Sequence, residues 1–249
     1  MKIEGYIMKR NYSAFTLAEV LITLSIIGVV AAMTLPTVIS KVDRKININR
    51  LKREYSVFQQ AFQKIAAEND VDFKNALSVC NDSSSKHACL KNIFKAKLST
   101  VLDCDTNSGE NLSKCFVPQS EAKQLNGKPV DPKYNGGYFN NNGTSGLVLN
   151  DGASASFWLD SNQCTTSLSP DLNRCGFIVI DVNGPVGKPN TWGKDLYLFF
   201  INSDKIKPAD ASTADGSCSE EGDDIVCFQD DCEVGTNYGM TCAGKYLFE

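Results

Sequence analysis

Apolar residues dominate the chain from Phe15 to Leu35 and then recur at helical spacing. The first segment holds one charged residue, Glu19. As a helix it would span about 31 Å, roughly the hydrocarbon thickness of a bilayer. After Pro36 a second apolar pattern alternates steps of four and three, which is typical of an amphipathic helix: Leu51, Tyr55, Phe58, Phe62 and Ile65. We therefore expect one long helix over residues 15–69, membrane-spanning over 15–35 and kinked at Pro36.

The remaining segment, residues 70–249, has the pattern of a small globular head. Residues 88–102 predict a short amphipathic helix, and residues 103–146, rich in Asn, Gly, Pro and Ser, predict a loop. Four apolar segments with short connections predict strands: 146–149, 154–159, 177–182 and 196–201. The expected fold is α+β, with a four-stranded antiparallel sheet packed on the amphipathic half of the long helix.

Ten cysteines all lie after residue 79, and no two are spaced CxxC. Structural zinc sites and thioredoxin-like redox sites use that close spacing, so a disulfide framework is favoured. Disulfides persist in oxidising compartments, which predicts that this part of the chain lies outside the cytosol. Nearest-neighbour pairing would give five short loops: Cys80–Cys89, Cys104–Cys115, Cys164–Cys175, Cys218–Cys227 and Cys232–Cys242.

The residues that flank the apolar segment do not decide whether it is a cleaved signal or in which direction it crosses the membrane. Lys9 and Arg10 before it, and small residues at 30–32 within it, also suit a cleaved secretory signal. The segment is long for that, and a carboxylate near a bilayer centre costs roughly 2.5–3.5 kcal/mol on insertion scales. Basic residues are more numerous after the segment than before it, which by the positive-inside rule would place the C-terminal side in the cytoplasm. The cysteines indicate the reverse, and we give them more weight.

Lys9-Arg10, the stretch Ala14–Leu21 and the apolar run closing at Pro36 together resemble the class III signal of type IV pilins and type II secretion pseudopilins. The resemblance implies that a membrane prepilin peptidase cuts between Ala14 and Phe15 and methylates the new amine. Residues 1–14 would then be a leader peptide, or residues 8–14 if translation starts at Met8. The family more often has Gly where this chain has Ala14.

The resemblance also implies how the processed chain assembles. The Glu19 carboxylate would pair with the Phe15 amino group of a neighbouring subunit, because two buried charges that neutralise each other cost less than one alone. The alternative is a Glu19 that reaches the headgroups or is protonated. Gly28 and Pro36 would bound a stretch of helix that loosens on packing. The implied partners are other pilin or pseudopilin subunits, prepilin peptidase and an inner-membrane assembly platform.

Two acidic segments of the head are candidate calcium sites, since Ca²⁺ prefers carboxylate and carbonyl oxygens. The first, the glycine-rich connection after residue 180, contains Asp181, Asn183 and Asp195. Turn capping by Asp and Asn explains it as well. The second would be a solvated acidic loop on the simpler interpretation, and its members are Glu220, Glu221, Asp223, Asp224, Asp230, Asp231 and Glu233.

Composition and motifs indicate a structural protein and not an enzyme. The formal net charge of −4 gives no basic field for nucleic acid, and the single histidine, His87, belongs to no recognisable catalytic motif. We expect a pilus or pseudopilus subunit with no cofactor other than calcium, anchored in the inner membrane by one pass, with its head in the periplasm before assembly. The alternative is a minor pilin at a filament tip that acts as an adhesin or takes up DNA, for which the candidate residues are Lys86, Lys91, Lys95 and Lys97.

Overall fold

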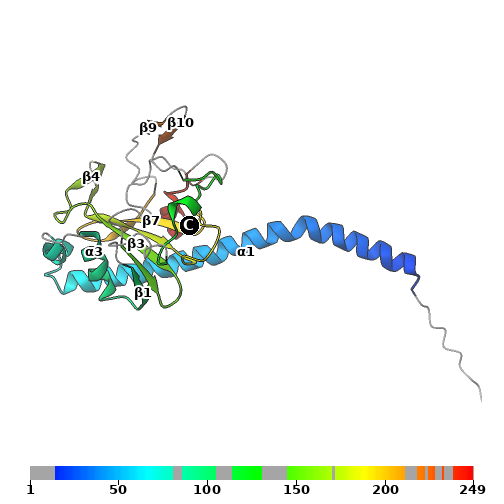
Figure 1. Cartoon of the computed structure of the whole chain (residues 1–249), viewed down its shortest axis with the longest axis horizontal. Coiled ribbons are helices and arrows are strands. Elements are labelled where there is room, and N and C mark those ends of the chain that lie inside the picture. Colours follow the sequence, from blue (N-terminus) through cyan, green and yellow to red (C-terminus); the bar gives the residue numbers. More distant parts are fainter. Residues whose placement is uncertain are drawn as a thin grey trace, which may run out of the picture. The chain divides into compact units, whose positions relative to one another are not determined.

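A computed structural model describes residues 15–80, 86–104, 114–130, 145–169, 172–210, 218–221, 224–227, 232 and 238–248. The chain divides into two units, residues 1–44 and 45–249. The helix α1, Leu17–Ala67, supplies the described helix of the first unit and continues into the second. It runs through Pro36 as one helix (Figure 1).

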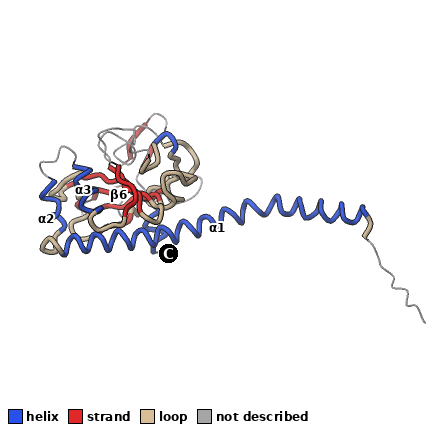
Figure 2. The backbone as a smooth tube through the Cα atoms, turned by 60° about the horizontal axis from the view of Figure 1, so that its bottom comes forward, coloured by secondary structure: helices blue, strands red, loops and turns tan. Residues whose placement is uncertain are grey.

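The second unit is built on a six-stranded antiparallel sheet, with strand order β1-β2-β3-β6-β7-β8 (Figures 1 and 2). The strands are β1 (Thr100–Cys104), β2 (Ser145–Leu149), β3 (Ser154–Leu159), β6 (Gly176–Asp181), β7 (Leu196–Ile201) and β8 (Ile206–Pro208). Two separate hairpins are formed by β4 (Thr166–Ser169) with β5 (Leu172–Arg174), and by β9 (Cys218–Glu221) with β10 (Asp224–Cys227).

The four predicted strands are the central strands β2, β3, β6 and β7, whereas both edge strands were missed. The prediction of a four-stranded sheet is therefore wrong in number and correct in class and direction. The predicted helix over 88–102 is also wrong at its end: α3 covers Lys86–Lys95, and residues 100–104 form β1. Leu102 and Asp103 pair with Val148 and Leu147 of β2, so sheet pairing overrides the helical spacing of the apolar residues.

One face of the sheet is covered by the second half of α1 and by short helices (Figure 2). The short helices are α2 (Phe73–Leu77), α3, the 3₁₀ turn η1 (Ser78–Cys80) and α5 (Cys242–Phe248). The stripe expected to pack on the head does so: Leu51, Phe58, Phe62 and Ile65 are at most 2% exposed. Tyr55 is half-buried and stacks on Phe199 with ring centroids 5.8 Å apart.

The other face of the sheet carries a second core. The irregular segment 114–130, which contains the 3₁₀ turn η2 (Gln119–Glu121), and the connection between β6 and β7 cover it. Most side chains on both faces of β6 and β7 are therefore buried, and these strands read as continuous apolar runs. The residues of the second core include Phe116, Val117, Phe177, Val179, Trp192, Leu198, Phe200, Tyr238 and Met240.

Disulfides tie the irregular parts of the head to its regular elements. Four of the nearest-neighbour pairs are formed: Cys80–Cys89, Cys104–Cys115, Cys164–Cys175 and Cys232–Cys242. The side chains of Cys218 and Cys227 lie outside the described residues, although the two residues are register partners in the β9–β10 hairpin. Short covalent loops of this kind limit the unfolded chain and stabilise a head with long irregular segments.

Candidate functional site

The N-terminal segment begins at Phe15, which is 85% exposed, and α1 starts two residues later. Thr16 and Glu19 cap the helix reciprocally: Oε2 of Glu19 accepts hydrogen bonds from the backbone N–H and hydroxyl of Thr16, both at 2.8 Å. The Thr16 hydroxyl oxygen accepts the Glu19 N–H at 3.3 Å. This is a capping box, which satisfies donors that a helix start otherwise leaves free. Ala14, the other side of the expected cleavage bond, lies outside the described residues.

Apart from half-buried Ala31, the apolar side chains of α1 in residues 17–44 are exposed, Leu17, Ile26, Val30 and Leu35 among them. Hydroxyl groups in this stretch bond to carbonyls of their own helix; Ser25 and Thr34, for example, donate to Leu21 and Val30 at 2.7 and 2.9 Å. Polar groups satisfied in this way can enter lipid at little cost. Among the described helices, α1 is the one long and apolar enough to cross a membrane.

Gly28 and Pro36 are the two residues expected from the sequence to weaken the helix. A Cβ added at Gly28 would meet no atom within 4 Å. Pro36 lies inside α1, where its missing N–H removes one helical hydrogen bond. Nothing in the described chain therefore requires glycine at position 28, which leaves its role in packing between subunits a prediction.

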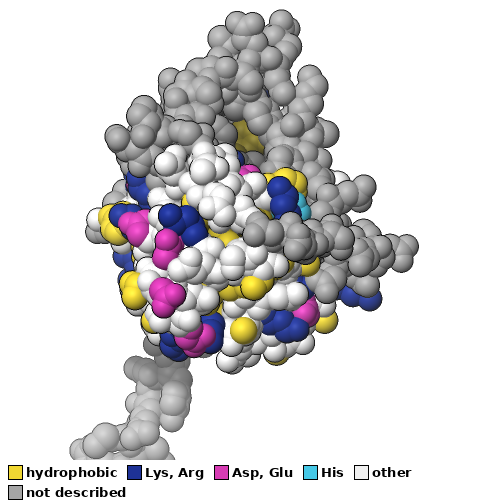
Figure 3. Space-filling view, turned by 90° about the vertical axis from the view of Figure 1, so that its left-hand side faces the viewer, with side chains coloured by type: hydrophobic (Ala, Val, Ile, Leu, Met, Phe, Trp, Pro, Cys, Tyr) yellow, Lys and Arg dark blue, Asp and Glu magenta, His cyan; other side chains and the backbone are white. Residues whose placement is uncertain are grey.

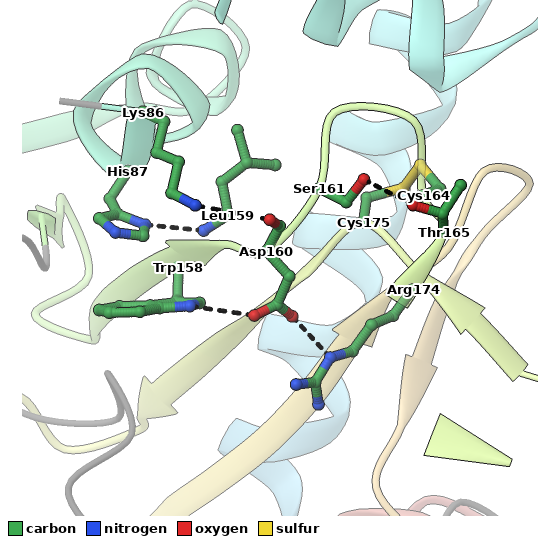
Figure 4. Close-up of polar contacts among 10 residues, drawn as sticks. All are labelled: Lys86, His87, Trp158, Leu159, Asp160, Ser161, Cys164, Thr165, Arg174 and Cys175. Carbon is green, nitrogen blue, oxygen red and sulfur yellow. Dashed lines mark hydrogen bonds and ion pairs between the residues drawn. A yellow bond between two sulfur atoms is a disulfide. The ribbon is translucent and has the colours of Figure 1, made fainter. Parts of the chain in front are cut away.

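His87 is a structural residue. Its Nδ1 accepts the backbone N–H of Leu159 at 2.9 Å, and its ring stacks on Trp158 with centroids 3.9 Å apart (Figure 4). Burial, and secondarily the charge of Lys86, lowers the pKa of His87 to about 4, so the ring is neutral near pH 7. The single histidine joins α3 to β3.

The polar groups around His87 also bind one another. Trp158 Nε1 donates to Oδ1 of Asp160 at 3.0 Å, and Arg174 pairs with Oδ2 of the same carboxylate at 2.5 Å (Figure 4). The Arg174 guanidinium lies 5.5 Å from the centroid of the Phe200 ring. This cluster of charge pair and aromatic rings joins the end of β3 to β5 and β7.

The four lysines considered for DNA binding do not form a free basic face. Lys91 is fully buried and pairs with Asp103, which also binds Lys95 with 2.5 Å between Nζ and Oδ2. Lys97 pairs with Glu68 at 2.5 Å, and Lys86 donates to the Asp160 carbonyl at 3.5 Å. In the described part of one face, basic and acidic side chains lie side by side (Figure 3). Such paired lysines provide little of the charge that phosphate binding needs.

The connection between β6 and β7 brings together Asp181, Asn183 and Asp195, as the sequence suggested. Both carboxylates are fully buried, and Asn183 Nδ2 donates to Oδ2 of Asp195 at 3.1 Å. Burial raises the pKa of both aspartates, and for Asp181 the neighbouring charge of Asp195 adds to the effect. No cluster of three or more His, Cys, Asp or Glu side chains occurs among the described residues. Any cation here would therefore need amide or hydroxyl oxygens as well.

The second acidic candidate cannot be described in the same way. The backbones of Glu220, Glu221 and Asp224 belong to β9 and β10, but their side chains lie outside the described residues. The other acidic residues of this stretch lie outside them entirely: Asp223, Asp230, Asp231 and Glu233.

Comparison with known proteins identifies the N-terminal segment. The prokaryotic N-terminal methylation motif matches residues 9–35, from the basic pair to the end of the apolar run. This motif is the class III signal of type IV pilins and pseudopilins, and it supports processing of this chain by prepilin peptidase. No curated protein and no solved structure matches the chain.

Proposed function

We propose that this protein is a structural subunit of a type IV pilus or a type II secretion pseudopilus. The observation that carries the proposal is the methylation motif at residues 9–35, joined to an apolar helix whose side chains are exposed over residues 17–44. In this proposal the prepilin peptidase cuts between Ala14 and Phe15 and methylates Phe15. The processed chain then leaves the membrane and packs through its helix into a filament.

The disulfides support a head that lies in the periplasm. Four of them are present in the head, and such bonds form and persist in oxidising compartments. Residues 15–35 would cross the inner membrane once, with the leader in the cytoplasm, in contact with prepilin peptidase and the assembly platform. The basic residues after the apolar segment would then lie at the periplasmic surface of the inner membrane; they are Lys41, Arg44 and Lys45.

Glu19 supports an assembly role for the N-terminus. Its carboxylate is held at the first turn of α1 by Thr16, one residue after the amine that cleavage would create. A neighbouring subunit's Phe15 ammonium would neutralise it, whereas an unpaired carboxylate in an apolar filament core would be costly. The tip-adhesin and DNA-uptake alternative gains no support from the lysines, because they are committed to ion pairs and hydrogen bonds inside the head.

The proposal is tested by expressing the full chain with and without a prepilin peptidase and measuring the mass of its N-terminal peptide. With the peptidase we expect the leader to be absent and Phe15 to carry one methyl group. An intact leader under both conditions would overturn the proposal.

Assembly is tested separately with Glu19→Ala, with Ser25→Ala as a matched control in the same exposed segment. We expect the Glu19 variant to insert and be processed but to be lost from sheared filaments, whereas the Ser25 variant assembles. Filament yields equal to wild type for the Glu19 variant would contradict the pairing.

A further inference from the structure

The stretch of α1 that follows the apolar segment is strongly basic. Residues 41–53 contain six basic residues and one acidic residue, Asp43, in a chain whose formal net charge is −4. In the orientation proposed above these residues lie on the periplasmic side, although basic residues ordinarily favour the cytoplasmic side of a membrane helix. The positive charge at this place therefore needs a cause other than membrane topology.

Two of these residues, Lys41 and Lys45, have no acidic counterpart on their own helix. They are four residues apart, so they lie one turn apart on the same side of α1. No carboxylate lies three or four residues from either lysine, and Asp43, two residues from each, faces another side. Both lysines are exposed, and neither forms an ion pair with a described residue. Like charges at this spacing destabilise a helix slightly, so a bound anion would stabilise it.

An exposed apolar strip runs beside the two lysines. Val38, Val42 and Ile46 follow one another at intervals of four residues and are 57%, 51% and 44% exposed. They extend the apolar surface beyond the membrane-spanning segment on one side, whereas the opposite side of the helix carries Ser40 and Arg44. Apolar side chains bordered by lysines are typical of a helix that lies in the headgroup region. Burial of this side at the bilayer surface would tilt the helix and bring the lysines toward the phosphates.

The distance along the helix decides which lysines can reach lipid. At 1.5 Å per residue, Lys41 lies about 9 Å and Lys45 about 15 Å beyond Leu35, the end of the apolar segment. The headgroup layer extends about 5–8 Å beyond the hydrocarbon, and salt screens a charge over about 8 Å. Both lysines are therefore within range of the phosphates, and their aliphatic stems can lie along the apolar strip. Lys52, on the same side of the helix but about 25 Å beyond Leu35, is outside that range.

We propose that Lys41 and Lys45 form a docking surface for the phosphate groups of anionic phospholipids in the periplasmic leaflet of the inner membrane. The ammonium groups donate to phosphate oxygens, while Val38, Val42 and Ile46 lie against the adjoining acyl chains. Each lysine close to an anionic lipid surface contributes about a fivefold preference for that lipid. The inference rests on the proposed membrane-inserted subunit and concerns that subunit before assembly. The attraction would retain it in the bilayer until it is withdrawn into a filament.

The test uses the full chain in nanodiscs of phosphatidylcholine that contain a trace of spin-labelled phosphatidylglycerol or, in parallel, of spin-labelled phosphatidylcholine. Electron paramagnetic resonance then measures how strongly each lipid is retained at the protein surface. The informative variants are Lys41→Gln, Lys45→Gln and the double variant, which remove charge at exposed positions. Lys52→Gln is the matched control, since it removes the same charge from the same side of the helix. An unchanged unfolding midpoint of the head shows that each variant is folded.

We expect wild type to retain phosphatidylglycerol at least about fivefold better than phosphatidylcholine. Each single variant should lose part of this preference, the double variant should lose all of it, and Lys52→Gln should keep it. Added salt should weaken the preference of wild type and leave the double variant unchanged. No preference in wild type would overturn the proposal. An equal loss in Lys52→Gln would also overturn it, because the whole basic stretch would then attract anions, as expected for acidic groups of a neighbouring subunit.

Failure of this inference can be distinguished from failure of the proposed function. The lipid measurement requires only that α1 inserts, which co-elution of the protein with the nanodiscs establishes, whereas leader cleavage and filament yield are measured separately. A chain that inserts, is processed and assembles without preferring phosphatidylglycerol would contradict the docking surface alone. A chain that does not insert would contradict both.

Discussion

Arg53 on α1 forms an ion pair with Asp151 in the turn between β2 and β3, with 2.8 Å between Nη2 and Oδ2. The next residue of the helix, Glu54, is 2% exposed and faces the same aspartate. Burial, followed by the hydrogen bond to Asp151 and its charge, raises the pKa of Glu54 to about 8, and Arg53 only partly opposes this. Glu54 is therefore protonated in the folded head at neutral pH.

This arrangement predicts a pH dependence of head stability. The pKa of Glu54 is raised from its ordinary value of 4.5 to about 8 in the folded head, so between these pH values the folded state binds more protons than the unfolded chain. The head therefore loses stability as pH rises through this range. We expect Glu54→Gln to become progressively more stable than wild type from pH 5 to pH 9, measured by denaturant unfolding. Glu68→Gln, at an exposed ion pair with Lys97, is the control and should show no such trend. A constant difference between Glu54→Gln and wild type would contradict the assignment.

The hydrogen bond that the Leu159 N–H donates to His87 predicts a second effect on the stability of the head. His87→Phe keeps a ring on Trp158 but leaves the buried Leu159 N–H without an acceptor, which costs about 1–3 kcal/mol. His87→Asn offers an oxygen near the position of Nδ1 and should recover part of the loss. Equal stability of the Phe variant and wild type in chemical denaturation would show that the bond contributes nothing.

His87 also predicts sensitivity to acid. Its pKa is lowered to about 4 in the folded head, whereas the unfolded chain takes up the proton below about pH 6.5. Stability should therefore fall as pH drops from about 6.5 to 4. The His87→Asn variant should lack this component, and comparing the two unfolding profiles between pH 4 and 7 measures it.

Phe58 is expected to carry much of the contact between α1 and the head. Its ring packs against Phe94 of α3 and Phe157 of β3, each with centroids 6.2 Å away. Phe58→Ala should cost about 3–5 kcal/mol because it leaves a cavity in a close-packed core. Val42→Ala, at an exposed position of α1, should leave head stability unchanged. Similar losses in both variants would contradict this division of roles.

Thr16 predicts an effect confined to the start of α1. Thr16→Val removes the hydroxyl that binds Glu19, whereas Thr16→Ser keeps it. The loss of such a cap costs about 0.5–2 kcal/mol. Amide exchange in micelles should accelerate at Glu19 in the Val variant and remain slow in the Ser variant. Unchanged exchange in both would mean that the hydroxyl does not hold the first turn.

The central strands could be predicted because the sheet is covered on both sides. Phe177–Ile180 and Leu196–Ile201 are apolar without interruption, which is how doubly buried strands appear in sequence. The edge strands lack that signal: β8 has three residues and ends in Pro208, and β1 has two exposed apolar residues, Val101 and Leu102. The partner of β1, β2, lies far away in the sequence, whereas β8 pairs with the preceding strand β7 but is too short for local periodicity to reveal it.

In the candidate sites too, contacts between residues that are distant in the sequence could not be predicted. Asp181, Asn183 and Asp195 share one connection, so their meeting could be expected from turn residues alone. Ser154 comes from another strand, and only strand register brings it beside Asp181. Thr16 was missed although Thr-x-x-Glu before an apolar run is a recognisable capping signal.

The first half of α1 is exposed and its second half is buried in the head. The contacts of the first half can therefore change without affecting the packing that stabilises the head. The side chains of residues 17–44 make few contacts within their own chain, so exchanging lipid for neighbouring helices breaks almost no intrachain packing. In the function proposed above, the head, closed by Leu51, Phe58 and Phe62, would keep its fold during that exchange. The proposed subunit would then move between a bilayer and a protein assembly, and back again, as a preformed part.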